Sequence, residues 1–563
     1  MKRLKGNPLP IGILIKEGGV NFSIVAEKGK ECSLLLYRVG STKPAYTFEM
    51  KEEDAIGNVR FLEVQGIDIK KYEYNYLIDG EIVTDNCAKA VAGKEIWGKE
   101  ADRSAHEIRG RFVSSDYDWE DDEWLKIPYE DVVAYELHVR GFTRHSSSKV
   151  KKKGTFAGVI EKIPYLKELG INQIHCMPVY EFEECLEDKV NYWGYGPAFY
   201  FAPKASYSSS KDPVNELKDM VKACHKAGIE VILEMAFEYG YSVHMMNECL
   251  RYYMLEYHVD GFIVNPAVLS PEDVRKDALL KDIKIMKYQD TFQAVMRRFL
   301  KGDEGMVGEV IGRLKQVSFQ DGVFNYMTSH NGFTLCDLVS YDRKHNEENG
   351  ERNEDGPDYN FSWNCGVEGP SRKKSIVQMR EKQMRNAFVF LLLAQGTPCI
   401  LAGDEFGNSQ NGNNNAYCQD NATGWLDWRK LEKEQELFSF VKNLIAFRKK
   451  YKVFHPSDEF LGIDRTSCGL PDVSYHGESA WHVPDEYVSR QLGVFYCKEE
   501  KLFVAYNMHW EEHTFGLPSL AKEEHWRQLL STQDGMFEET PLESERGVKV
   551  GARAVAVLQA VKE

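Results

Sequence analysis

A polar residue at the end of a short apolar strand is the first candidate for chemistry in this sequence. The run 261–264 is apolar and is stopped by a proline shortly afterwards, which predicts a strand buried on both faces. The strand ends on Asn265, whose neutral amide can form hydrogen bonds but cannot supply an anionic nucleophile. Two carboxylates lie at a second predicted strand, 229–235: Glu234 near its end and Glu238 just after it. A site at these strand ends would combine one amide with two acidic side chains.

Other kinds of chemistry have no matching pattern. No spacing of His, Cys, Asp or Glu resembles a metal site, and no serine turn indicates a nucleophile elbow. The 12 cysteines are scattered without a C-x-x-C pair, so we expect free thiols rather than a disulfide framework. We therefore expect neither a metal nor a cofactor.

Charge and composition limit the partners of the chain. Its 563 residues carry a formal net charge of -16, which argues against nucleic acid or an anionic membrane surface as the main partner. A neutral polysaccharide is compatible with this charge. The basic start of the chain is not followed by the apolar segment of a signal peptide, and no apolar run is long enough to span a bilayer. We expect a cytoplasmic location.

Strands and helices alternate from about residue 130, a pattern typical of an α/β barrel. In such a barrel the side chains at the C-terminal ends of the strands form the active site. The segments on either side alternate with period two or are rich in β-branched residues, which predicts two β-sandwiches. We expect three domains: an N-terminal β-sandwich at 1–125, a (β/α)8-type TIM barrel at 126–455 and a C-terminal β-sandwich at 456–563.

Several motifs resemble those of the α-amylase superfamily, glycoside hydrolase family 13. The stretch Tyr257 to Ala267 resembles the strand that reads D-G-F-R-F-D-x-A in that family. Further motifs resemble its glycogen-debranching, isoamylase and pullulanase branch and cover nearly the whole chain. They lie at 134–143, 191–195, 345–350, 363–366, 402–407 and 413–421. The resemblance implies a barrel enzyme acting on α-glucans, with a glucan-associated module at the N-terminus.

The residues that the resemblance implies for catalysis are missing. A retaining glycosidase needs two carboxylates roughly 5 Å apart, one as nucleophile and one as general acid. The position of the family's nucleophile is Asn265, and the Arg that pairs with it is replaced by Ile263. A third family Asp, which binds sugar hydroxyls, is replaced by Asn331, although His330 beside it is kept.

The family's general acid is the residue whose position in this sequence is hardest to identify. The strand at 283–286 corresponds to the family's acid strand, and its continuation 287–290 contains no Glu. Glu309 lies in a stretch that resembles a region downstream of that strand, so we expect a structural helix residue there. The alternative is that Glu309 is a surviving acid. Because the acid strand is abbreviated, we expect the barrel to be distorted near 283–290.

The remaining candidates for binding are aromatic residues and one histidine. By their place in the family motifs, Tyr195 and His330 are the first candidates for a sugar subsite. Trp193 is better explained by packing in the barrel, and stays a weaker candidate. The full set of predicted substrate-binding residues is Tyr192, Trp193, Tyr195, His330 and Trp363.

Three hypotheses of function follow. The first is a catalytically degenerate relative of debranching enzymes that binds α-glucan, or acts as the regulatory partner of an active glucan-metabolising enzyme. The second is an active α-1,6-glucosidase with relocated carboxylates, such as Glu309 with Glu234 or Glu238. The third is an interaction protein without affinity for glucans. The loop at 240–244, which is short where the family has a long substrate loop, favours the first.

Overall fold

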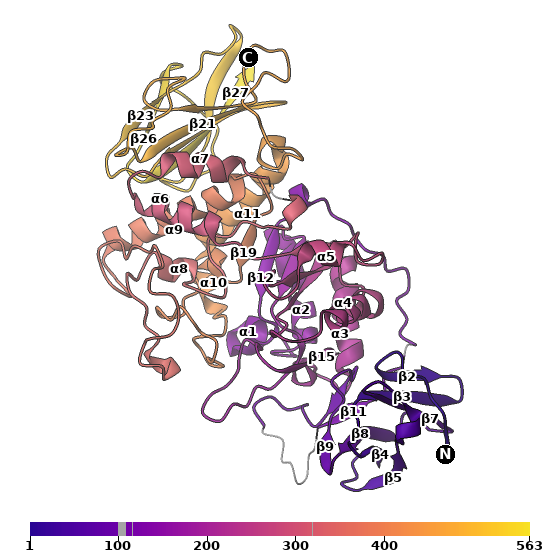
Figure 1. Ribbon diagram of the computed structural model, residues 1–563. Coiled ribbons are helices and arrows are strands. Elements are labelled where there is room, and N and C mark those ends of the chain that lie inside the picture. Colours follow the sequence, from indigo (N-terminus) through magenta and orange to yellow (C-terminus); the bar gives the residue numbers. More distant parts are fainter. Residues whose placement is uncertain (100–107, 115, 318, 563) are drawn as a thin grey trace.

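The computed structural model describes residues 1–99, 108–114, 116–317 and 319–562. A central barrel lies between two β-rich regions, with the N-terminus at one end of the molecule and the C-terminus at the other (Figure 1). Part of the predicted N-terminal domain, residues 100–107, lies outside the described residues. Among the described residues, no helix is both long and apolar enough to cross a membrane.

Two antiparallel sheets form the N-terminal region. Their facing sides bury alternate apolar residues, including Phe22, Leu34 and Tyr76, which is the period-two pattern that the sequence showed. One sheet has the order β1-β7-β3-β2 with β6 paired to β7, and the other has the order β10-β11-β8-β4-β5 with β9 paired to β8. The strands are β1 Lys2–Leu4, β2 Gly12–Lys16, β3 Gly19–Val25, β4 Cys32–Arg38, β5 Pro44–Glu49, β6 Ala55–Ile56, β7 Val59–Gln65, β8 Tyr72–Ile78, β9 Glu81–Val83, β10 Val91–Ala92 and β11 Arg109–Arg111.

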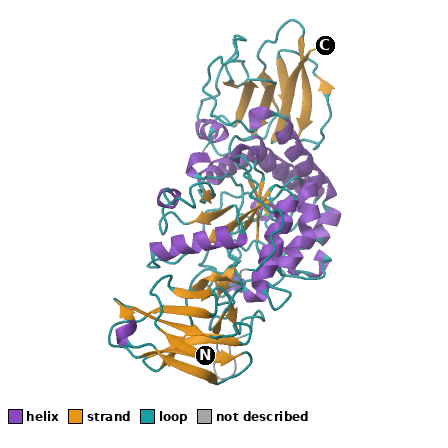
Figure 2. Ribbon diagram, turned by 90° about the vertical axis from the view of Figure 1, so that its right-hand side faces the viewer, coloured by secondary structure: helices purple, strands orange, loops and turns teal. Residues whose placement is uncertain are grey.

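Six parallel strands make up the wall of the barrel, in the order β18-β17-β16-β13-β12-β19. Each is short and almost entirely buried, as expected for strands covered on both faces. The strands are β12 Ala134–Leu137, β13 Gln173–Cys176, β16 Glu230–Met235, β17 Gly261–Val264, β18 Lys284–Met286 and β19 Cys399–Leu401. Figure 2 shows the helices curving around these central strands.

The barrel closes through one further extended segment, 323–326. It forms parallel bridges to Lys287 on one side and to Pro398 on the other. In the described part of the chain the wall therefore contains seven parallel segments, where the predicted eight-stranded form would have one more. Between β18 and this segment the chain forms α6 (Thr291–Lys301) and α7 (Val307–Lys315) in succession without a strand between them. The departure falls next to 283–290, where we expected a distortion.

The helices begin and end at local signals in the sequence. The side chain of Asp212 accepts a hydrogen bond from the backbone of Asn215 and starts α3, with Pro213 in its first turn. Gly170, with a φ of 100°, ends α2 in the left-handed conformation. The helices in the barrel region are α1 Val139–Arg144, α2 Phe156–Leu169, α3 Pro213–Lys226, α4 Val243–Tyr257, α5 Pro271–Arg275, α8 Leu335–Leu338, α9 Lys374–Leu393, α10 Arg429–Lys433 and α11 Gln435–Lys450, besides α6 and α7.

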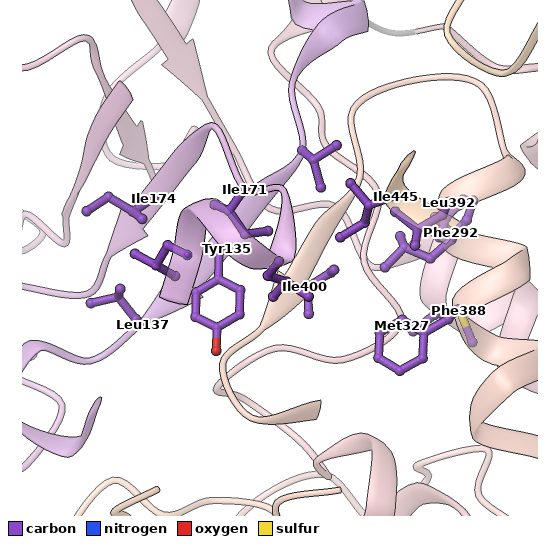
Figure 3. Packing of buried hydrophobic residues seen from close by; sticks show 14 of the residues in the cluster. Tyr135, Leu137, Ile171, Ile174, Phe292, Met327, Phe388, Leu392, Ile400 and Ile445 are labelled. Carbon is purple, nitrogen blue, oxygen red and sulfur yellow. The ribbon is translucent and has the colours of Figure 1, made fainter. Parts of the chain in front are cut away.

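A continuous apolar core joins the strands to these helices. Figure 3 shows Tyr135 and Ile400 on neighbouring strands, and Phe388 and Leu392 on α9. All four side chains are buried. An antiparallel pair, β14 (Tyr180–Phe182) with β15 (Ala198–Pro203), extends from the barrel on the side of the N-terminal region. The core holds the strand ends, and therefore the site described below, in fixed positions.

The C-terminal region is again β-rich. A six-stranded sheet has the order β20-β21-β22-β27-β24-β25, and β23 pairs with β26 in a second sheet. The strands are β20 Val473–His476, β21 Gln491–Cys497, β22 Lys501–Asn507, β23 His513–Gly516, β24 Glu524–Ser531, β25 Thr540–Pro541, β26 Gly547–Val550 and β27 Ala554–Lys562. The predicted fold class, a TIM-type barrel flanked by two β-rich domains, is confirmed. The domain boundaries at 125 and 455 stay a prediction.

Candidate functional site

A cleft with a volume of about 710 Å³ opens at the C-terminal ends of the barrel strands. Its walls come from β16 and the loop after it, from the end of β17, and from the segments at 288–290 and 326–331. It is the place where a barrel carries its active site. The polar residues that line it include Tyr195, Glu234, Asn265, Asp290, His330 and Asn331.

Four side chains form a hydrogen-bonded chain beside this cleft. Tyr195 donates its hydroxyl to Oε1 of Glu234 at 2.6 Å. Nε2 of His330 lies 2.7 Å from the same hydroxyl oxygen, and Nδ1 of His330 lies 2.6 Å from Oε1 of Glu136. Because the single hydroxyl proton of Tyr195 goes to Glu234, His330 has to donate from both ring nitrogens. The arrangement therefore fits a doubly protonated His330 between Glu136 and Tyr195.

The charges along this chain support that protonation state. Burial alone would lower the pKa of His330, but the carboxylates of Glu136 and Glu234 together outweigh it and the pKa lies above its usual value. Burial also raises the pKa of Glu234, against the opposing effects of His330 and Tyr195. Burial raises the pKa of Tyr195 well above its ordinary value, so its hydroxyl keeps its proton.

Glu234 keeps one oxygen free for a ligand. Its side chain is 7% exposed, and its Oε2 atom has no hydrogen-bond partner among the described residues. A buried carboxylate oxygen without a partner costs free energy, and a ligand hydroxyl would remove that cost. Glu234 is therefore the side chain in the cleft most clearly prepared to accept a hydrogen bond.

The end of β17 carries no acid. Ile263 is 2% exposed and packs with Ile232, Met286 and Phe324 in the apolar interior of the barrel. The side chain of Asn265 accepts a hydrogen bond from the backbone of Ala267 at 3.0 Å, so its amide oxygen holds the local turn. Neither residue presents a negative charge to the cleft.

A second carboxylate, Asp290, lines the cleft from the segment between β18 and α6. Asp290 accepts hydrogen bonds from the hydroxyl of Tyr326 at 2.6 Å and from Nε2 of Gln293 at 2.7 Å. Tyr288, two residues earlier, packs edge-on against His330 with ring centroids 5.6 Å apart. Asp290, Tyr288 and Glu136 were not among the predicted site residues. Asp290 follows a strand and precedes α6, a position from which it could have been proposed as a site carboxylate.

The exposed rim of the cleft is formed by the short loop after β16. Glu238 is exposed, and the ring of Tyr239 is 75% exposed. Both residues line the cleft. The chain passes through Gly240 into α4 within a few residues, so that this side of the cleft stays open.

Comparisons with known proteins agree on one family. A family model described as "Alpha amylase, catalytic domain" matches residues 137–257. A Haemophilus influenzae protein, "Glycogen operon protein GlgX homolog", is 32% identical, with 79% of this chain and 84% of that protein covered. "Isoamylase 3, chloroplastic" of Oryza sativa subsp. japonica is 31% identical, with 92% of this chain and 79% of that protein covered.

The chain belongs to glycoside hydrolase family 13. Its relatives place it in the isoamylase and glycogen-debranching branch of that family. The catalytic module of the glycogen-degrading pneumococcal virulence factor SpuA has a similar structure, with a TM-score of 0.78 at 18% identity over 99% of this chain and 97% of that one. A pullulanase from Bacillus acidopullulyticus gives a TM-score of 0.73 at 20% identity, over 98% and 75% respectively. At these identities the two structures establish the fold alone.

Glu309, the alternative acid, lies in the first turn of α7, is exposed, and does not line the cleft. The structure thus agrees with a structural helix residue. It does not support a pair of Glu309 with Glu234 or Glu238.

The aromatic residues expected to bind sugar divide into two groups. Tyr195 and His330 line the cleft, and their binding of sugar stays a prediction. Tyr192, Trp193 and Trp363 do not line it, so the cleft gives no support to a role of these three in sugar binding. Tyr192 is 2% exposed and donates its hydroxyl to the backbone of Gly424, which makes it a packing residue.

The two tryptophans also have structural roles. Trp193 is buried and packs edge-on against His330, with ring centroids 4.8 Å apart, so it holds the ring of a residue that lines the cleft. The guanidinium group of Arg553 lies over the ring of Trp363, 4.3 Å from the ring centroid, near the C-terminal sheet. An aromatic motif in a sequence is compatible with packing and with sugar binding alike, so the motifs alone do not distinguish the two roles.

Proposed function

We propose that this family 13 protein binds α-glucan in the cleft at the C-terminal face of its barrel without hydrolysing it. The observation that carries the proposal is the end of β17. There Ile263 fills the apolar interior and the amide of Asn265 holds a turn, at the positions of the family's arginine and nucleophile. A retaining glycosidase cannot form its glycosyl intermediate without a carboxylate nucleophile.

The lining of the cleft supports a sugar as the ligand. The rings of Tyr195, Tyr239 and Tyr288 offer flat surfaces for the apolar faces of sugar rings. Oε2 of Glu234 and the carboxylate of Asp290 offer acceptors for hydroxyl groups. The related pullulanase from Paenibacillus barengoltzii was solved in complex with maltohexaose, which makes this oligosaccharide the first probe to use.

Hydrolysis by relocated carboxylates is the second candidate. Glu234 and Asp290 both line the cleft, and the raised pKa of Glu234 is a property that a general acid requires. Against this candidate, Oε1 of Glu234 already accepts from Tyr195, and Asp290 is held by Tyr326 and Gln293. The turnover assay at the end of the Discussion separates the two candidates.

The proposal includes a cytoplasmic location and an enzyme partner. All twelve cysteines are free thiols, which fits the reducing conditions of a cytoplasmic compartment. A protein that binds glucan without cleaving it would serve as a regulatory or targeting partner of an active glucan-metabolising enzyme. No nucleic acid or membrane partner is part of this proposal.

Binding is tested by electrophoresis in gels that contain glycogen or amylopectin. The wild type should be retarded, and Tyr239→Ala should weaken binding about fivefold, the order expected for the loss of about 1 kcal/mol of aromatic contact. Tyr487→Ala is the matched control, because Tyr487 is 71% exposed and lies outside the cleft, whereas Tyr239 is 75% exposed and lines it. Unretarded wild-type protein, or equal effects of both variants, would support an interaction protein without glucan affinity.

A further inference from the structure

A second cavity, of about 610 Å³, lies at the opposite end of the barrel from the cleft. It is lined by Glu230 at the start of β16, by Asp260 just before β17, and by Lys284 at the start of β18. These strand starts face away from the C-terminal ends that form the cleft. The cavity is therefore separate from the glucan site, and what it binds does not depend on the proposed function.

The deep part of this cavity is polar, and most of its polar atoms have hydrogen-bond partners. Lys284 pairs with Glu230 and donates to the backbone of Ile127 at 2.6 Å. Asp260 uses Oδ2 to accept from the backbone of Val231 at 2.8 Å and lies 2.9 Å from His225. Its other oxygen, Oδ1, is buried and has no partner among the described residues, although Asp260 is only 5% exposed. A ligand group that donates a hydrogen bond would satisfy this oxygen.

The outer part of the cavity carries uncompensated positive charge. Lys126 and Lys281 are exposed, and within the described ranges neither side chain forms an ion pair or a hydrogen bond. Arg275 is half-buried and donates to the backbone of Ile285 at 3.0 Å, but it too faces no carboxylate partner among the described residues. Among the described residues that line the cavity, only Asp282 is an acid without an ion-pair partner. Two unpaired lysines and an arginine that contacts only a backbone carbonyl thus face one unpaired acid, although the chain carries a net charge of -16.

Aromatic and apolar side chains form the walls between these two parts. Tyr129 and Phe319 lie nearly parallel, with ring centroids 6.0 Å apart and an interplanar angle of 15°. Trp124 and Leu279 remain 37% and 49% exposed at the cavity. Such walls suit the flat face of a ring.

We propose that this cavity, the N-terminal cavity, binds a phosphate ester carried on a ring that has hydrogen-bond donors. The phosphate lies among Lys126, Arg275 and Lys281, the ring lies against Tyr129 and Phe319, and a donor of the ring meets Asp260. A hexose phosphate and a nucleoside monophosphate share this chemistry. The experiment distinguishes them.

The test is isothermal titration calorimetry of the full chain at low salt. The probes are glucose 6-phosphate and AMP, with inorganic phosphate, glucose and adenosine for comparison. We expect one phosphate ester to bind about tenfold more tightly than inorganic phosphate and than its own unphosphorylated form, as charge-assisted hydrogen bonds predict. The ester that binds more tightly identifies the source, and added salt should weaken its binding because the cations are exposed.

Two charge variants locate the binding. Replacing Lys126→Ala and Lys281→Ala together should weaken the ester about tenfold, for the loss of two charge-assisted contacts. The matched control, Lys151→Ala with Lys153→Ala, removes the same charge from an exposed loop that does not line the cavity, and should bind as the wild type does. The proposal is wrong if neither ester binds at millimolar concentration, or if inorganic phosphate binds as tightly as both esters. It is also wrong if the two double variants behave alike, or if maltohexaose displaces the ester.

Discussion

The hydroxyl of Tyr195 donates to Glu234 at 2.6 Å, and this one hydrogen bond fixes the protonation of its neighbours. His330 approaches the same oxygen at 2.7 Å and can only donate to it, while its other nitrogen faces Glu136. These contacts favour the doubly protonated, charged form of the buried His330 ring. Such a chain orients hydrogen-bonding groups, and it makes stability depend on pH.

The first prediction concerns that dependence. The pKa of His330 is raised in the folded state, so protonation of this ring favours folding. Its contribution is complete below about pH 6.5, the ordinary value for histidine, and is lost as pH rises through the folded-state pKa. Thermal unfolding from pH 6 to pH 9 should therefore show a steeper fall of Tm for the wild type than for His330→Gln.

The control for this experiment is His244→Gln. The side chain of His244 is exposed in the first turn of α4, forms no ion pair or hydrogen bond within the described residues and does not line the cleft, so the replacement should leave the slope unchanged. Parallel curves for the wild type and His330→Gln would show that His330 is not the charged group inferred from the geometry.

The second prediction concerns the barrel interior. Ile263→Arg would restore the family's residue type, but it places a charge among Ile232, Met286 and Phe324. An unpaired buried charge costs about 3–5 kcal/mol. We expect a clear loss of stability in chemical denaturation, while Ile263→Val, which removes one methylene group, should cost only about 0.5–1.5 kcal/mol. Equal stability of Ile263→Arg and the wild type would mean that the site still accommodates an arginine.

The third prediction concerns Glu309. Because its carboxylate is exposed in the first turn of α7, outside the cleft, Glu309→Gln should leave glucan binding unchanged. Stability should change by less than about 1 kcal/mol, the limit for a charge near a helix N-terminus. Affinity electrophoresis and thermal unfolding check both expectations. A marked loss of glucan binding would return Glu309 to the site.

The sequence predicted the barrel elements better than the site. The apolar run at 132–139 predicted a strand, and the structure has β12 from Ala134 to Leu137. The strand is shorter because the side chain of His138 accepts from the backbone of Gly141 and starts α1. A cap of this kind depends on the orientation of one ring, which the apolar pattern does not contain.

From the sequence, a site residue could be predicted only where its chemical type alone determines what it can do. Asn265 and Ile263 lack a charge wherever the chain places them, so the sequence alone predicts that the end of this strand carries no acid. The surroundings that leave one oxygen of Glu234 without a partner, and the contact of Asp290 with Tyr326, depend on segments that are far apart in the chain. Their proximity depends on the closure of the barrel through 323–326, and the successive helices α6 and α7 that allow it were not expected.

The central claim, binding without hydrolysis, is tested most directly by the release of reducing ends from glycogen, amylopectin and pullulan by the purified full chain. We predict no release above the blank for the wild type and for Asn265→Asp, since an aspartate there would still lack the paired arginine and a general acid. The combination of Ile263→Arg, Asn265→Asp and Asn331→Asp should also be inactive, because acid catalysis alone accounts for about a hundred- to ten-thousand-fold in rate. Turnover by the wild type that disappears in Glu234→Gln or in Asp290→Asn, but persists in Glu309→Gln, would contradict the claim and identify a hydrolase with relocated carboxylates.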